Sequence, residues 1–385
     1  MNKPRKLRLW IPITIIIVLV ALNVVSFASE STMRFIVPPF SIFLGILGLS
    51  TWWIFLAGKF RWKFWLGEIG VTILLILFGM ATLKYDGSAH GGMPIAFKWK
   101  WSPEVEDGIG ELPVAAGNVE IGAGDPDLAD FPAFLGPKQD GIVEDPGLNP
   151  DWSANPPEEL WRIPVGLGWS AFSIVGERAV TQEQRGEQEL VTCYHVKTGQ
   201  LIWAHEDTAR FSEAMGGVGP RATPTIADGV VYALGATGIL NAINLESGEL
   251  LWTRDSLADG GGGNIEWGKS GSPVLTEEFV IVTGSESAQN GLIAYRRDNG
   301  EIAWQAGTGP ASYSTPQLLE FGGVEQLVNV FGKNVSGFDP KTGAQLWTHD
   351  WPGSSPKVAN PLRYNDGQLL VTTSYTAPSK LLNIT

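Results

Sequence analysis

Two patterns of apolar and polar residues divide the chain. Within residues 1–84, three runs of about 20 apolar residues follow one another with almost no charge inside them. A helix needs about 20 such residues to cross roughly 30 Å of hydrocarbon. Residues 1–84 are therefore predicted to be a membrane anchor of three transmembrane helices, at about 9–28, 36–57 and 65–83.

The cations beside these runs predict an orientation. Four basic residues precede the first run, and three more separate the second from the third: Lys3, Arg5, Lys6, Arg8, Lys59, Arg61 and Lys63. Short loops rich in Lys and Arg stay in the cytoplasm. We therefore expect a multi-pass protein of the cytoplasmic (inner) membrane with its large domain on the periplasmic side. Alternatively the first run is a signal peptide cleaved after Ala28, which leaves that domain on the same side.

Residues 85–130 are rich in Gly, Pro, Asp and Glu and poor in bulky apolar residues. Such a composition cannot form a core, so this segment is predicted to be an acidic linker. One stretch differs, because apolar and basic residues alternate over 97–101. It could form a short strand, but we favour an aromatic anchor at the lipid surface.

From about residue 159 onward the chain repeats itself. Four segments align without gaps, at 193–203, 242–252, 294–304 and 337–347, and in each a Gly is followed four residues later by a Trp. The Trp residues are 49, 52 and 43 positions apart, and Trp161 stands 42 positions before the first. A fixed period of this length indicates a repeat architecture.

Each repeat predicts short β-strands joined by tight turns. Asp228-Gly229 and Asp366-Gly367 have the residue types of hairpin turns with positive φ, and β-branched runs lie beside them. A four-stranded unit of about 40–50 residues matches one propeller blade, which covers its face only by stacking on the next. The predicted fold is all-β, a β-propeller over 131–385 with about five four-stranded antiparallel blades visible.

The repeated residues are expected to be structural, with indoles packing between blades and glycines in turns. They are Trp161, Trp203, Trp252, Trp304 and Trp347, with Gly199, Gly248, Gly300 and Gly343. Cys193 aligns with Ala and Gly of the other repeats, so it too is assigned to packing. The four histidines lack the spacing of a metal site and are expected at the surface.

The repeat Ala-x-Asn-x-x-Ser-Gly-x-x-x-Trp at 242–252 resembles that of the PQQ-binding-like (quinoprotein) β-propellers. This family includes membrane quinoprotein dehydrogenases and a propeller lipoprotein of the machinery that assembles outer-membrane β-barrels. His195 and Arg296 depart from the family pattern where Asp or Asn usually forms a turn hydrogen bond. The resemblance implies seven or eight blades, so the ring is expected to be incomplete at its C-terminus or to close in an unusual way.

Charge and cysteine content narrow the function. Residues 1–84 hold nine of the 27 Lys and Arg and two of the 40 Asp and Glu, which leaves residues 85–385 with a net charge of −20. A nucleic-acid partner is excluded on this ground. The single cysteine excludes an intramolecular disulfide, a CxxC redox pair and a CxxCH haem site.

One long loop, 259–273, departs from the period and offers an amide, a carboxylate and an indole in Asn264, Glu266 and Trp267. The resemblance implies a use for these types, since quinoprotein enzymes hold Ca²⁺ with Glu and Asn and stack Trp on the quinone. A flexible blade connection is the structural interpretation. Trp169 and Arg221 occupy matching positions and are candidates to line the same mouth. No metal site is assigned.

Two functions remain open. The first is a membrane-anchored, extracytoplasmic scaffold without catalysis, which binds envelope proteins or polysaccharide. The second is a membrane quinoprotein dehydrogenase that uses PQQ with Ca²⁺, oxidises a sugar or alcohol and passes electrons to membrane quinone. We favour the scaffold, because no quinone-reducing site is identifiable in the sequence.

Overall fold

A computed structural model gives the protein's structure and divides the chain into two compact units, 1–103 with 214–216, and 104–213 with 217–385. The residues described are 10–28, 45, 48–50, 52, 70, 73–74, 77–88, 95–103, 106–110, 112–113, 115, 121–122, 130–143, 147–149, 151–213, 216–287, 289–353, 356–373 and 378–384.

The first unit contains helix α1 (Trp10–Ala28), which coincides with the first predicted span. No helix in the described part of the chain meets the length and hydropathy required to cross a membrane, so the prediction of three transmembrane helices is not confirmed. Most of the second predicted span, 36–57, lies outside the described residues. The third ends in helix at 77–82, after which strand β1 begins.

Strands β1 (Leu83–Ser88) and β2 (Ile95–Trp99) form an antiparallel hairpin in this unit. Of the alternating residues, 97–99 form the end of β2, and 100 and 101 lie in the turn after it. The anchor at a lipid surface stays a prediction. The rings of Trp99 and Trp101 stack, with centroids 5.1 Å apart. An antiparallel partner satisfies the backbone of β2, while alternation exposes Phe97 and Trp99.

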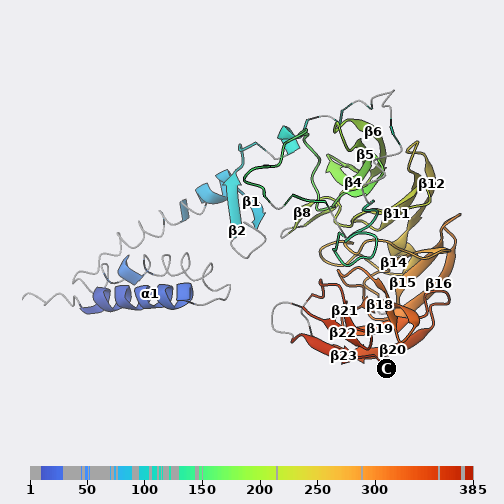
Figure 1. Cartoon of the computed structure of the whole chain (residues 1–385). Coiled ribbons are helices and arrows are strands. Elements are labelled where there is room, and N and C mark those ends of the chain that lie inside the picture. The colour runs from blue at the N-terminus through green and yellow to red at the C-terminus, as the bar shows by residue number, and fades with distance from the viewer. Residues whose placement is uncertain are drawn as a thin grey trace, which may run out of the picture. The chain divides into compact units, whose positions relative to one another are not determined.

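The second unit is a series of antiparallel sheets, or blades, that follow one another around an arc (Figure 1). Blade 1 contains β3 (Ser173–Val175), β4 (Arg178–Arg185), β5 (Gln188–His195) and β6 (Leu201–Thr208). Blade 2 contains β9 (Thr225–Ala227), β10 (Val230–Leu234), β11 (Ile239–Asn244) and β12 (Leu250–Asp255). Blade 3 contains β13 (Val274–Leu275), β14 (Phe279–Thr283), β15 (Gln289–Arg296) and β16 (Ile302–Thr308).

Blade 4 contains β17 (Gln317–Phe321), β18 (Val324–Val330), β19 (Asn334–Phe338) and β20 (Gln345–Asp350). The described part of blade 5 has β21 (Leu362–Asn365), β22 (Gln368–Val371) and β23 (Lys380–Asn383). A small hairpin, β7 (Ser212–Glu213) and β8 (Gly217–Val218), the 3₁₀ turn η3 (Glu106–Gly108) and helix α4 (Ser256–Asp259) lie in connections. The predicted all-β domain of four-stranded antiparallel blades is confirmed.

Successive blades are joined near their first strands by a ladder of hydrogen bonds. The N–H of Ala171 donates to Thr223 Oγ1 (3.2 Å), and the N–H of Thr223 donates to Ser272 Oγ (3.0 Å). The N–H of Ser272 donates to Thr315 Oγ1 (3.0 Å), and the N–H of Thr315 donates to Asn360 Oδ1 (2.9 Å). These acceptors precede Pro in the repeated element, so each repeat places one side-chain oxygen where the previous blade needs an acceptor.

The repeated indoles contact glycine turns of the next blade. A Cβ atom on Gly248 would lie 2.7 Å from the ring of Trp203, and Trp203 Nε1 donates to Leu245 O at 2.9 Å. The same approach joins Trp161 to Gly199, Trp252 to Gly300 and Trp304 to Gly343. Each of these glycines has φ between 69° and 73°, so both the backbone and the close ring favour a residue without a side chain.

The two predicted Asp-Gly turns differ. Asp228 and Gly229 have φ of 50° and 74°, as a hairpin turn with two left-handed residues requires. Asp366 and Gly367 also join two strands, but neither has a positive φ, so that part of the prediction is wrong. Asn365 Oδ1 instead accepts from Gly367 N–H at 3.0 Å and holds this turn in another conformation.

Candidate functional site

Each blade is preceded by a segment that leads into its first strand. The surface formed by these segments, on the side of the arc that faces its centre, is here called the mouth. In the repeated element, five residues occupy the equivalent position: Trp169, Arg221, Ser270, Tyr313 and Val358. Trp169 N–H donates to Pro220 O at 2.8 Å, and Tyr313 N–H donates to Lys357 O at 3.0 Å, so these segments lie side by side. The Trp169 side chain is exposed (67%).

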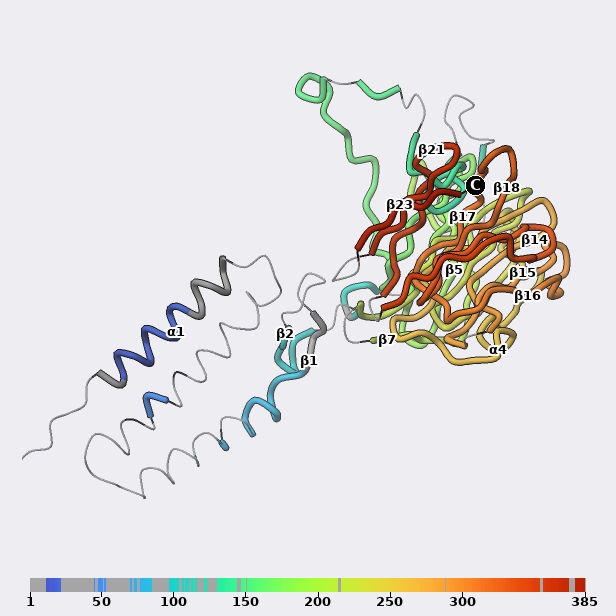
Figure 2. The backbone as a smooth tube through the Cα atoms, turned by 90° about the horizontal axis from the view of Figure 1, so that it is seen from below, coloured from blue at the N-terminus to red at the C-terminus, as the bar shows by residue number. Residues whose placement is uncertain are grey.

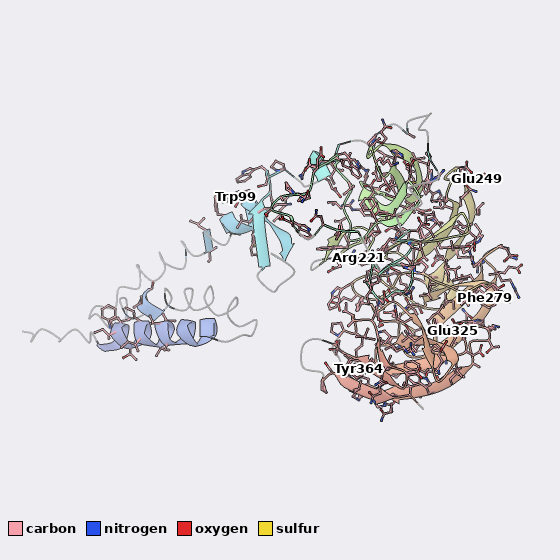
Figure 3. The ribbon with its side chains drawn as sticks, viewed as in Figure 1. Trp99, Arg221, Glu249, Phe279, Glu325 and Tyr364 are labelled. Atoms are coloured by element: carbon pink, nitrogen blue, oxygen red, sulfur yellow. The ribbon has the colours of Figure 1, made fainter. Side chains whose placement is uncertain are left out.

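Arg221 lies on the side of the arc that faces its centre, whereas Glu249 lies at the outer rim (Figure 3). Its guanidinium is largely buried and pairs with Glu213 Oε1 at 3.1 Å. The same group donates to Gly217 O and lies 4.7 Å from the ring centroid of Phe211. Burial lowers the pKa of Arg221, and the contact with Glu213 opposes that shift. Arg221 therefore holds the β7–β8 hairpin against the mouth.

The long loop also reaches the mouth. Asn264 Nδ2 donates to Ala236 O at 2.8 Å, while Asn264 Oδ1 is buried without a hydrogen-bond partner among the described residues. Trp267 stacks on Tyr313 with ring centroids 5.0 Å apart, and the backbone N–H of Trp267 donates to the Tyr313 hydroxyl at 3.3 Å. Glu266, the residue before Trp267, is exposed. The loop is a packed connection, and the structure brings Trp267 and Glu266 to the mouth.

Tyr313 also lies at the mouth and was not identified from the sequence. Burial raises its pKa, and the negative charges of Glu266 and Glu213 act in the same direction while Arg221 opposes them. Tyr313 therefore connects the Trp267 loop with the Arg221 group. Its place in the repeat, three residues before Pro like Arg221, was a signal that could have found it.

A buried carboxyl group lies between blades 1 and 2 near the mouth. Glu189 pairs in register with Asp207 on the neighbouring strand, and Glu189 Oε2 accepts from Ala236 N–H at 3.2 Å. Burial raises the pKa of Glu189 to about 7; the charge of Asp207 adds to this, while the Ala236 hydrogen bond and Arg221 oppose it. Glu189 thus loses its proton near neutral pH, facing another carboxylate.

Replacement of Glu189 by Gln is expected to stabilise the fold at alkaline pH. The pKa of Glu189 in the folded protein is about 7, above the ordinary value of 4.5. The contribution of this carboxyl group to the free energy of unfolding is therefore complete below pH 4.5 and is lost as pH rises through 7. Above that range the wild type is less stable by about 3 kcal/mol. Urea unfolding across pH should show Glu189→Gln gaining stability over wild type at pH about 8 but not at pH about 4. An equal gain at both values would contradict this account.

The described donor set does not fit the calcium site that the quinoprotein alternative requires. Ca²⁺ takes six to eight oxygen ligands, several of them carboxylates. No group of three or more His, Cys, Asp or Glu within the described residues could hold a metal ion. Asn264 Oδ1 has no hydrogen-bond partner among the described residues and Glu266 is exposed, but one amide oxygen and one carboxylate fall short of the oxygen ligands that Ca²⁺ takes.

Two other residues have defined surroundings. Cys193 is fully buried in the core between blades 1 and 2, and burial raises the pKa of its thiol to about 12, so the thiolate form needed for nucleophilic attack is suppressed. His195, expected at the surface, is buried instead: its ring contacts Thr198 Oγ1 (2.8 Å) and Glu177 Oε2 (3.3 Å). At this third motif position the imidazole of His195 contacts the Thr198 hydroxyl of the turn. In the next repeat the equivalent residue is Asn244, whose Oδ1 accepts from two backbone N–H groups of the turn.

A protein-family model described as outer membrane protein assembly factor BamB matches residues 153–317. The chain is similar to the BamB proteins of Yersinia pestis, with 37% identity over 76 residues, and Escherichia coli strain K12, with 31% over 102 residues. These matches cover 18% and 24% of this chain. The chain thus spans only 18% and 25% of the length of these two curated relatives.

Among solved structures, BamB from Moraxella catarrhalis matches with a TM-score of 0.37 and 15% identity over 57% of this chain and 76% of that one. The quinohemoprotein alcohol dehydrogenase of Comamonas testosteroni matches with a TM-score of 0.40 and 14% identity over 57% and 40%. The residues matched by the family model, 153–317, lie within the repeated part of the chain.

Proposed function

We propose, from the premise that these repeats are of the PQQ-binding-like β-propeller type, that the protein is a non-catalytic scaffold for envelope proteins. One observation carries the proposal. At the mouth, the polar groups of Arg221 and Asn264 hold loops in place, whereas Trp169 at the equivalent position exposes its indole. Such an arrangement offers a contact surface rather than a reacting group.

The choice of a protein partner rests on the mouth's composition and on the relatives. Trp and Tyr supply large contact areas at little entropic cost and are enriched at interfaces. The curated relatives are named as outer membrane protein assembly factors, which supports an envelope protein as the partner class. Polysaccharide is the other ligand class that aromatic side chains suit, and detection of a protein adduct at the mouth distinguishes the two.

The anchor forms the second part of the proposal. The three apolar runs in residues 1–84 and the Lys and Arg beside them support attachment to the cytoplasmic membrane with the propeller outside. Under this proposal, alkaline carbonate should leave the full chain in the membrane fraction, and protease added to spheroplasts should cleave the propeller. Release by carbonate or protection from protease would contradict it.

Trp169 is expected to be a binding residue and not a folding residue. Truncation of an indole at the centre of an interface commonly costs 2 kcal/mol or more, about thirtyfold in affinity. A photo-reactive amino acid at position 169 should therefore form a discrete protein adduct in cells, and Trp169→Ala should weaken association with that partner by tenfold or more. Leu251, a similarly solvent-facing residue (49% exposed) on the outer strand β12, is the matched control position.

Three results would count against the scaffold. Adducts of equal yield at positions 169 and 251 would remove the mouth as the binding surface. Binding to cell-wall polysaccharide without any protein adduct would change the partner class. Dye reduction with a panel of sugars and alcohols after PQQ and Ca²⁺ are added would favour the dehydrogenase.

A further inference from the structure

The hairpin of β1 and β2 presents two unlike faces. In its register Leu83 lies opposite Trp99, and Lys84 lies opposite Lys98. Because successive side chains of a strand point to opposite faces, Phe97 and Trp99 share one face, while Lys98 lies on the other. The end of β2 is therefore amphipathic, with aromatic rings on one face and a cation on the other.

The aromatic face of this hairpin is exposed. Phe97 is 62% exposed, Trp99 44% and Trp101 68%. Trp101 follows β2 in the turn, and its ring stacks on that of Trp99 with the two planes 10° apart. The two indoles thus form one flat apolar surface beside Phe97. Exposed apolar side chains that gather in this way mark a contact surface.

Exposed apolar side chains also lie on the helical residues just before the hairpin. Residues 77–82 are helical and β1 follows at once, so both strands lie at the end of this helix (Figure 2). Two hydrogen bonds hold the hairpin there, because Lys100 N–H donates to Thr82 O and Lys100 Nζ donates to Met80 O, both at 2.8 Å. Three side chains of the helix are more than half exposed: Leu77, Phe78 and Met80.

We propose that the aromatic face of the β1–β2 hairpin lies in the interfacial region of a phospholipid bilayer, with its lysine face toward water. The inference rests on the proposed membrane anchor, because residues 77–82 belong to the third apolar run of that anchor. Trp is enriched at membrane interfaces, where its ring meets hydrocarbon and its N–H meets the polar headgroups. An amphipathic element with aromatic residues on one face and cations on the other lies in this region and does not cross it.

Charge favours lipid over a protein partner as the occupant. The lysines of the hairpin, Lys84 and Lys98, and Lys100 in the turn, suit the phosphate groups that border the interfacial region, and β2 contains no acidic residue. The exposed helix residues beside the hairpin are all apolar, as contact with hydrocarbon requires. One bilayer can cover both surfaces.

Labels at two neighbouring positions of β2 test the proposal in the full-length chain reconstituted into phospholipid vesicles. Phe97→Cys and Lys98→Cys are each labelled with a fluorescent dye, while the native Cys193 is fully buried and stays unlabelled. A lipid that carries a nitroxide near its headgroup should quench the dye at 97, and aqueous iodide should quench the dye at 98. The ratio of lipid to iodide quenching should differ by about threefold or more between the two positions, because side chains alternate along the strand.

A second set of variants tests the indoles. In the chain labelled at 97, replacement of Trp99 and Trp101 by Ser should reduce quenching by the lipid, because the hairpin then loses its interfacial side chains. Leu251→Ser, at an exposed position of the outer strand β12, is the matched control and should leave that quenching unchanged. These three side chains are partly or largely exposed, so the fold is retained.

Three results would overturn the proposal. They are equal lipid quenching at 97 and 98, quenching by iodide alone at both positions, and shielding of position 97 from both quenchers, which would indicate a protein contact. Failure of the anchor is a different result, because carbonate would then release the chain from the vesicles. A chain that stays in the vesicles while iodide alone quenches position 97 would contradict only the placement of the hairpin.

Discussion

Trp203→Ala is expected to destabilise the propeller by about 3–5 kcal/mol. The indole is 6% exposed and lies in the core shared by blades 1 and 2, with Val180, Val191 and Ile243 among its neighbours. Its removal leaves a cavity against Gly248, which has no side chain to fill the space, and leaves Leu245 O without its donor. Both losses act on the contact that holds two blades together.

Urea unfolding of the full chain, followed by far-UV circular dichroism, would measure this effect. Trp169→Ala provides the matched control, because it removes the same side chain from a position that is 67% exposed. The control should change the unfolding free energy by less than about 0.5 kcal/mol. A cost below about 1 kcal/mol for Trp203→Ala would show that the repeated indoles do not hold the blades together.

Lys269→Met is expected to destabilise the protein strongly in alkaline solution and much less in acid. The Lys269 side chain is fully buried, and its Nζ donates to Thr283 O (2.5 Å), Thr283 Oγ1 (2.7 Å) and Gly284 O. Met matches the length of the chain but donates to none of these acceptors. Leaving such acceptors unpaired commonly costs about 1–3 kcal/mol each.

The dependence on pH follows from the pKa of the amine. Burial lowers the pKa of Lys269 to about 7 from 10.5, so wild-type stability from this group is complete above pH 10.5 and is lost as pH falls through 7. This lowering of the pKa corresponds to about 5 kcal/mol. The deficit of Lys269→Met should therefore be larger at pH about 9 than at pH about 6.

Paired unfolding curves at the two pH values would test this, with Lys341→Met, an exposed lysine on blade 4, as the control. The control should show no such dependence on pH. If Lys269→Met lost the same free energy of unfolding at both pH values, the pKa of Lys269 would not be lowered by burial.

Two Asp-Gly turns show how much local structure could be predicted from the sequence. Asp228-Gly229 adopted the conformation that its residue types predict, because the hairpin depends on local φ preferences. Asp366-Gly367 did not, because the Gly367 N–H donates a hydrogen bond to the side chain of the neighbouring Asn365. The alternation at 97–101 suited a strand or an aromatic anchor; residues 97–99 lie in a strand because 83–88 supply its partner, and the anchor stays a prediction.

The candidate site was predicted only in part. Trp169 and Arg221 were proposed from their matching places in the repeat and Trp267 from the long loop 259–273, and their role as a binding site stays a prediction. Glu189 and Tyr313 were missed, because their importance depends on burial and on charges from other blades. His195 looked like a surface residue until the structure placed it against Glu177.

By itself, the sequence determined that this chain builds antiparallel blades, since a recurring Gly, a Trp four residues later and a Pro-led strand are local signals that each repeat carries in full. Tertiary structure alone decided which carboxyl, amine and imidazole groups lost contact with water, and which indoles stayed exposed to it. Those properties come from contacts between residues about 40 to 50 positions apart, whose chemistry depends on the neighbour that stacking supplies and not on their own segment.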